Sequence, residues 1–230
     1  MAIAFFDLDL TVLARNSGTL WAKSELRTGH ITRWQALKAF AWLTRYHFGF
    51  ARLEDALLES ISSLTGKLET EVRARTMAFY EAEVRQLIRP GAQAAIDRHR
   101  RAGDHLWLLT SSSNYLSEAV MEQLSLDGSL CNRFEVDASG RFTGRPAGAL
   151  CYGPGKVEVA QAFAKEKGVP LAECAFYSDS TSDLPMLEVV GHPVAVNPDP
   201  RLRRIAVRRG WPVEDWGVAA PPPSPSLTDG

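Results

Sequence analysis

Three short apolar segments, each followed at once by small polar or acidic residues, most restrict what this chain can fold into. Apolar runs of this length, bounded by turn-forming residues, are typical of buried strands. A helical pattern follows each polar cluster, so strands and helices alternate as in α/β proteins with a parallel sheet. Parallel strands end on the same side of their sheet, so we expect the polar clusters to converge there. The segments are residues 2–6 before Asp7 and Asp9, residues 105–109 before Thr110 and Ser111, and residues 174–177 before Asp179 and Asp183.

The first cluster contains two carboxylates one residue apart, Asp7 and Asp9. Side chains alternate along a strand, so both would face one crevice if the strand continued. Acids this close repel each other unless a cation or a shared proton relieves them, which indicates a hard metal ion or acid–base chemistry. Aspartates that cap a following helix are the alternative, and this stretch alone leaves both interpretations open.

Two further places in the chain have the chemistry of a phosphate site. Thr110 and Ser111 begin a hydroxyl-rich stretch before a predicted helix over residues 115–123. Hydroxyls and N–H groups at a helix N-terminus can bind phosphate, although an ordinary serine N-cap is the simpler interpretation. Lys156 lies at the start of another predicted helix, where the helix dipole disfavours a cation. Its position indicates a nearby anion, although an exposed lysine is the commoner case.

Residues 15–89 interrupt the alternation of strands and helices. Apolar residues recur there at helical spacing, which predicts an insert of three or four helices. We therefore expect an α/β core over residues 1–14 and 90–217, a helical cap over residues 15–89, and a disordered Pro-rich tail over residues 218–230. The aromatic residues of the insert fit the core of a small bundle better than an apolar wall over a substrate or lipid. They are Trp34, Phe40, Trp42, Tyr46, Phe48 and Phe50.

The charge and the cysteine content limit which binding partners and which cellular compartment we expect. The formal net charge of -1 at pH 7 gives no general attraction to nucleic acid or to anionic membranes. We interpret the arginine-rich stretch 201–209 as a solvated helix face. The three cysteines lack CxxC spacing, so neither a disulfide framework nor a zinc site is expected. With no membrane-spanning run and no signal-peptide pattern, we expect a soluble cytoplasmic protein.

In their order along the chain, these clusters resemble four motifs of the haloacid dehalogenase superfamily of hydrolases. The resemblance runs from residue 3 to about residue 213. The position of the helical insert is similar to that in the phosphoserine phosphatase-like branch (subfamily IB), which implies a Rossmann-like parallel sheet core with an inserted helical cap domain. The matching residues are Asp7-Leu8-Asp9-Leu10-Thr11, Leu108-Leu109-Thr110-Ser111, Lys156, and Ser178-Asp179 with Asp183.

The resemblance implies a phosphatase that hydrolyses phosphomonoesters. Asp7 would be the nucleophile that forms an aspartyl-phosphate, and Asp9 would act as general acid and then as general base. Thr110, the Ser111 N–H and Lys156 would hold the phosphoryl oxygens. An acid at position 9 favours a phosphatase or phosphotransferase over a dehalogenase, which has no alkoxide to protonate.

The resemblance also implies Mg²⁺ as the cofactor. Asp7, the backbone carbonyl of Asp9 and Asp179 would be its ligands, with Asp183 supporting them from nearby. The cap would close over the site, exclude water during the first step and select the leaving group.

The expected partner is a small phosphorylated metabolite, such as an amino acid or amino alcohol phosphate of the phosphoserine or histidinol phosphate kind. Asn16 stands where phosphoserine phosphatases have a glutamate that contacts the amino acid group, which argues against phosphoserine. A lipid phosphate is a further possibility because of the aromatic insert. The sequence indicates no particular oligomeric state.

Two other functions fit the same motifs. A phosphotransferase would use the same intermediate and pass the phosphoryl group to an acceptor other than water. A catalytically inactive phosphate-binding regulatory module is disfavoured because the charged motif residues are all retained. Nucleic-acid binding through the arginines and a stable membrane association are not expected.

Overall fold

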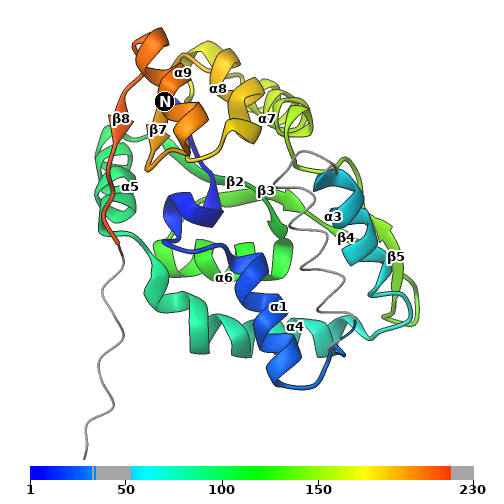
Figure 1. Cartoon of the computed structure of the whole chain (residues 1–230). Coiled ribbons are helices and arrows are strands. Elements are labelled where there is room, and N and C mark those ends of the chain that lie inside the picture. Colours follow the sequence, from blue (N-terminus) through cyan, green and yellow to red (C-terminus); the bar gives the residue numbers. More distant parts are fainter. Residues whose placement is uncertain (33, 35–52, 219–230) are drawn as a thin grey trace, which may run out of the picture.

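The computed structural model describes residues 1–32, 34 and 53–218, and within them six strands form one parallel sheet (Figure 1). The strand order is β3-β2-β1-β6-β7-β8, so the first strand of the chain lies inside the sheet between β2 and β6. The predicted α/β fold with a parallel, Rossmann-like sheet is confirmed. The strands are β1 (Ile3–Phe6), β2 (His105–Ser113), β3 (Gly128–Asn132), β6 (Ala175–Ser178), β7 (His192–Val196) and β8 (Val213–Glu214).

Helices cover both faces of this sheet, as the continuous apolar runs of its inner strands require. In β1, Ala4 and Phe6 pack into one apolar cluster, whereas Ile3 and Phe5 pack into another. Helices α5 and α6 contribute to the first cluster, and α7, α8 and α9 contribute to the second. These helices are α5 (Pro90–Ala102), α6 (Asn114–Leu124), α7 (Pro154–Glu166), α8 (Leu184–Val189) and α9 (Pro200–Arg209).

The chain turns tightly directly after β1, over residues Leu8–Val12. The amide of Leu13 donates to the carbonyl of Leu8 over 2.8 Å, and the side chains of Leu8 and Val12 are buried. Leu10 has a φ of 62°, in the left-handed region that residues with a Cβ rarely occupy. The turn ends the strand alternation at Asp7, so Asp7 and Asp9 have different neighbours.

The described part of the insert is helical, as expected from its periodicity. It comprises α1 (Ser17–Arg27), α3 (Leu53–Ser62), α4 (Glu69–Phe79) and the short turns Tyr80–Val84 and Arg85–Leu87. Phe79, Tyr80 and Val84 share an apolar cluster with the sheet and α5, so the end of the insert packs directly on the core. Trp34 is exposed. The other aromatic residues of the predicted bundle or wall lie outside the described residues, and so does the predicted tail beyond residue 218.

A separate antiparallel hairpin, β4 (Phe134–Val136) with β5 (Phe142–Pro146), joins the insert to the core. Figure 1 shows it beside α3. The amide of Gly66 donates to the Phe142 carbonyl over 2.9 Å, and the Phe142 amide donates to the Lys67 carbonyl over 3.0 Å. The hairpin thus ties residues 65–68 of the insert to the chain that follows β3.

The remaining short turns are Leu171–Glu173 and Thr181–Asp183. Within the described residues, no helix combines the length and the apolar character needed to cross a bilayer.

Candidate active site

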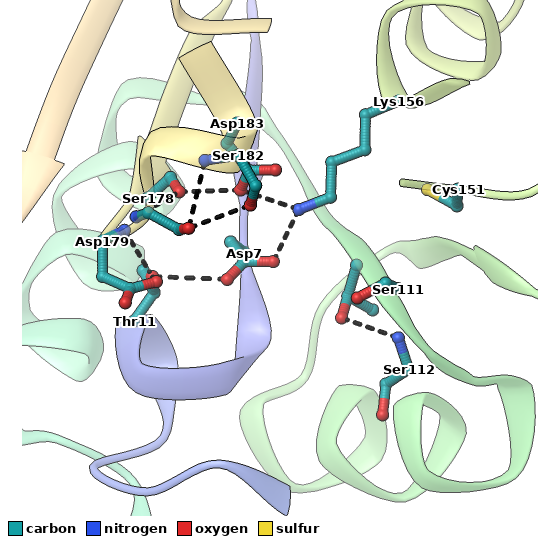
Figure 2. Close-up of polar contacts among 12 residues, drawn as sticks. Asp7, Thr11, Ser111, Ser112, Cys151, Lys156, Ser178, Asp179, Ser182 and Asp183 are labelled. Carbon is teal, nitrogen blue, oxygen red and sulfur yellow. Dashed lines mark hydrogen bonds and ion pairs between the residues drawn. The ribbon is translucent and has the colours of Figure 1, made fainter. Parts of the chain in front are cut away.

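The ends of β1 and β6 and the first turn of α7 bring three carboxylates and one ammonium group together. Figure 2 shows the Lys156 side chain extending from α7 to Asp7 and Asp183, with Asp179 on the far side of Asp7. Lys156 and Asp183 are each 2% exposed, and Asp7 is 7% exposed. The polar clusters that follow β1 and β6 therefore converge in the structure, as predicted.

Lys156 forms two short ion pairs in this cluster. Its Nζ lies 2.7 Å from Asp7 Oδ1 and 2.8 Å from Asp183 Oδ2. Burial alone would favour the neutral amine, but the two carboxylates outweigh it and raise the pKa of Lys156. The anion expected beside Lys156 is therefore this pair of carboxylates, which hold its ammonium group at the strand ends.

Asp7 and Asp179 meet at the hydroxyl group of Thr11. Thr11 Oγ1 lies 3.2 Å from Asp179 Oδ1 and 3.5 Å from Asp7 Oδ2, and it accepts a hydrogen bond from the Asp179 amide at 3.0 Å. Burial, opposed by Lys156, raises the pKa of Asp7 to about 7. Burial and the neighbouring Asp7 carboxylate raise the pKa of Asp179 well above its ordinary value. One lysine therefore does not neutralise this group of acids.

The residues present fit a hard divalent cation at this point. A hydroxyl group has one proton, so Thr11 can donate to only one of the two carboxylates that face it. A cation between Asp7 and Asp179 would remove the excess negative charge, and oxygen ligands suit Mg²⁺. In the described part of the chain, no group of three or more His, Cys, Asp or Glu side chains is arranged to hold a metal ion. Mg²⁺ does not require such a group, because two carboxylates with a backbone carbonyl and waters are enough to bind it.

Asp9 has a different environment from Asp7, because its carboxylate accepts a hydrogen bond from the insert. Asp9 Oδ1 lies 2.6 Å from the Ser17 amide nitrogen, in the first turn of α1. Burial raises the pKa of Asp9, and the hydrogen bonds from Ser17 oppose that effect. The first turn of α1 is itself capped by Asn16, whose Oδ1 accepts from the Thr19 amide at 2.8 Å. The insert is thus bonded to the residue expected to act as acid.

Thr110 and Ser111 lie in the last part of β2, not in the turn after it as the sequence suggested. The Thr110 hydroxyl is buried and accepts from the Ser112 amide at 3.1 Å, and the Ser111 carbonyl accepts from Asn132 Nδ2 at 2.7 Å. Ser113, two residues further on, is the N-cap of α6. Figure 2 shows Ser111 and Ser112 across the site from Asp179, on the side of Lys156. The N-cap of α6 is therefore Ser113, and Thr110 and Ser111 precede it within the strand.

The loop from Ser178 to Asp183 is held by its own hydroxyl groups. The Ser178 hydroxyl donates to Asp183 Oδ2 at 2.7 Å, and the Ser180 and Ser182 hydroxyls lie 2.9 Å apart. Ser178 and Thr11 stand within the matching motifs, but neither of them was assigned a role from the sequence. Ser178 directly precedes Asp179 and Thr11 follows Asp9 by two residues, so a hydroxyl group close to a motif carboxylate was the available signal.

The chain is similar to known proteins in sequence and in fold. A family model described as haloacid dehalogenase-like hydrolase matches residues 4–188. A phosphoserine phosphatase of Mycobacterium tuberculosis is 30% identical over 223 residues, which cover 95% of this chain and 72% of that protein. A histidinol-phosphatase of Neisseria meningitidis is 27% identical over 215 residues, 92% of this chain and 97% of that protein. A crystal structure of a Bordetella pertussis protein of unknown function superimposes with a TM-score of 0.86 at 30% identity, covering 94% of this chain and 99% of the other.

The chain belongs to the haloacid dehalogenase-like hydrolase family. Within that family it is similar to the phosphoserine phosphatase-like branch, and it is an enzyme of the phosphatase class.

Proposed function

We propose that the protein is a Mg²⁺-dependent phosphomonoesterase that hydrolyses a small phosphorylated metabolite through an aspartyl-phosphate on Asp7. The observation that carries this proposal is the buried Asp7 carboxylate, held by Lys156 at 2.7 Å through one oxygen and facing Thr11 and Asp179 with the other. A carboxylate fixed at a strand end beside an ammonium group is suited to in-line attack on phosphorus.

The chemistry divides into two displacements. In the first, a carboxylate oxygen of Asp7 attacks phosphorus, the ester P–O bond breaks, and Asp9 gives its proton to the leaving oxygen. In the second, Asp9 takes a proton from water as the water oxygen attacks the aspartyl-phosphate, which releases phosphate and restores Asp7. The raised pKa of Asp9 favours the protonated form needed for the first displacement.

The other motif residues stabilise the phosphoryl group during both displacements. Thr110, the Ser111 N–H and Lys156 would hold its non-bridging oxygens. Asp7, the Asp9 carbonyl and Asp179 would hold Mg²⁺, with Asp183 supporting them through its bond to Lys156. Mg²⁺ supplies positive charge that offsets the repulsion between an anionic substrate and the acidic cluster.

We propose residues 15–89 as the cap, which closes over the site and selects the leaving group. The hydrogen bond from the Ser17 amide to Asp9 supports this role, because it places the first turn of α1 at the acid beside the leaving oxygen. We also propose a cytoplasmic location, since Cys131, Cys151 and Cys174 are free thiols in the structure.

The proposed substrate is an amino alcohol phosphate or a related small ester, in preference to phosphoserine. Both kinds of substrate occur in the names of the relatives. The Asn16 side chain accepts hydrogen bonds from the amide and hydroxyl of Thr19, so it is used in capping α1 and carries no charge for an amino acid group. We therefore expect histidinol phosphate to be hydrolysed more efficiently than phosphoserine.

The test is phosphate release from a panel of phosphomonoesters by the full chain, with Mg²⁺ and with EDTA. The panel includes histidinol phosphate, phosphoserine and a short-chain lipid phosphate, and Asp7→Asn is the control variant. Hydrolysis that is lost in EDTA and in the variant supports the proposal. Folded, metal-loaded protein that hydrolyses no ester would instead indicate the inactive module, and transfer to added alcohols in preference to water would indicate a phosphotransferase.

A further inference from the structure

The first residue before α9, Asp199, is bonded to the loop that carries Asp179 and Asp183. Asp199 Oδ2 accepts from the Thr181 amide at 2.7 Å, and the Thr181 hydroxyl donates to the same carboxylate at 2.8 Å. The Asp199 amide donates to the Asp179 carbonyl over 2.8 Å. Asp199 therefore contacts the peptide groups on both sides of Ser180.

Helix capping accounts for only part of the hydrogen bonds that this carboxylate accepts. Asp199 Oδ1 accepts from the amides of Arg201 and Leu202 at 2.8 Å each, the ordinary task of an N-cap residue. The remaining contacts are with Thr181 in the loop: its amide donates to Oδ2, and its hydroxyl lies 2.8 Å from both Oδ1 and Oδ2. A shorter N-cap residue such as serine would serve the helix equally well but would not span the distance to Thr181.

We propose that Asp199 is a positioning residue that fixes the loop from Asp179 to Asp183 and so determines how tightly the site binds Mg²⁺. The Asp179 carboxylate approaches Asp7 at the Thr11 hydroxyl, and mutual repulsion tends to separate the two acids. The contacts of Asp199 oppose that separation from behind the loop, so that the two carboxylates are already arranged when the cation arrives. This inference rests on the proposed function, because it concerns the same metal site.

Three variants separate the two tasks of Asp199. Asp199→Ser keeps an N-cap for α9 and removes the contact with Thr181. Asp199→Asn keeps the length but turns an amide N–H group toward the Thr181 N–H group. Thr181→Val removes the hydroxyl and leaves the amide. The bond from the backbone amide of residue 199 to the Asp179 carbonyl is available in all three.

The measurement is Mg²⁺ binding by isothermal titration calorimetry on full-length protein, together with the melting temperature in EDTA. We expect Asp199→Ser to bind Mg²⁺ about tenfold more weakly, the lower end of the range found when groups that orient metal ligands are removed. Asp199→Asn should be intermediate, and Thr181→Val should weaken binding less than Asp199→Ser. Adding Thr181→Val to Asp199→Ser should cause no further loss, because the contact is already broken.

Leu202→Ala is the matched control on the same helix. Leu202 is fully buried, so its truncation lowers the melting temperature without touching the Asp199 contacts. Its Mg²⁺ affinity should equal that of the wild type. Equal affinity in wild type and Asp199→Ser, or an equal loss in Leu202→Ala, would overturn the positioning role. A wild type that binds no Mg²⁺ would overturn the proposed function as well.

Discussion

At the scale of single residues, the site depends on one lysine among three buried acids. Lys156 bonds to Asp7 and Asp183, whereas the Asp179 carboxylate accepts its hydrogen bond from the hydroxyl of Thr11. Removing one partner of a buried pair is more costly than the pair is worth, because the remaining charge stays buried. The cluster is therefore sensitive to loss of the lysine and to pH.

We expect Lys156→Met to abolish hydrolysis and to lower the free energy of unfolding at pH 8 by about 3–5 kcal/mol. The pKa of Asp7 is about 7 in the folded protein, above its ordinary value of 3.8. Between these two pH values the folded state binds more protons than the unfolded state, so the metal-free protein loses stability as the pH rises from 3.8 to about 7. Lys156 lowers that pKa, so the variant should be affected less at pH 5 than at pH 8. Urea denaturation in EDTA at the two pH values measures this. Lys165→Met, an exposed change on the same helix, is the control, and a loss that does not depend on pH would contradict the argument.

Much of the arrangement was predictable residue by residue, because most of the motif residues follow strand ends. Asp7 and Asp183 follow β1 and β6, and Lys156 reaches both of them from the first turn of α7. The contacts of Thr11 with Asp179 join residues 168 apart in the chain, and no local pattern predicts such a partner. The same holds for the link between Thr181 and Asp199, since a sequence shows that Asp199 can cap a helix but not what its second oxygen contacts.

At the scale of elements, α1 is connected to Asp9 through the amide of its first residue. The first position of a helix tolerates proline, because its N–H has no partner within the helix. Asn16 already has extended backbone angles, φ −76° and ψ 115°, which suit a residue before proline. Ser17→Pro can therefore remove the contact with Asp9 while keeping the helix.

We expect Ser17→Pro to raise the pKa of Asp9, because the hydrogen bonds from Ser17 stabilise its ionised form. Asp9 must be protonated to deliver its proton, so the alkaline limb of the kcat/KM profile should move to higher pH. The measurement is that profile with the preferred ester. Ser17→Ala, which keeps the amide donor, should move the limb less. An unchanged limb in Ser17→Pro would mean that the Ser17 contact does not control Asp9.

The sequence predicted the long elements better than the short ones. Strand β3 was missed because its Gly-Ser-Leu-Cys-Asn composition lacks an apolar run, and it forms by pairing with β2. Its first residue is Gly128, and a larger residue would not fit there, because a Cβ would lie 2.4 Å from the Trp107 ring. Strand β2 continues to Ser113 because it pairs with Asn132 beyond a register shift, which hydropathy alone does not reveal.

At the scale of the whole molecule, the segment after β8 closes the sheet against α5. Trp216 is 4% exposed and packs on Tyr177, and its carbonyl accepts from the Gly91 amide at 3.1 Å. A Cβ on Gly91 would lie 2.5 Å from the Trp216 side chain, so this approach requires glycine. Arg89 adds a hydrogen bond to the Gly217 carbonyl. The chain therefore stays in contact with the sheet and the start of α5 as far as Gly217.

We expect Trp216→Ala to lower the free energy of unfolding by about 3–5 kcal/mol, as for other buried aromatic residues truncated to alanine. Guanidinium denaturation followed by circular dichroism measures this. A chain ending at Val218 is the control and should unfold like the full chain. Wild-type stability in Trp216→Ala would show that the packing around Tyr177 contributes little.

The place of β1 in the sheet also determines when the enzyme is completed during its synthesis. Strand β1 is translated before both of its neighbours and must wait for β2 and β6, made about 100 and 170 residues later, before it is paired on both sides. Asp7 and Lys156 are separated by 149 residues, and the loop with Asp179 and Asp183 is translated later still. Contacts between such distant segments form slowly and late. A nascent chain that ends before Asp183 therefore cannot assemble the cluster of Asp7, Lys156, Asp179 and Asp183, and the apolar β1 stays without its full set of partners until then.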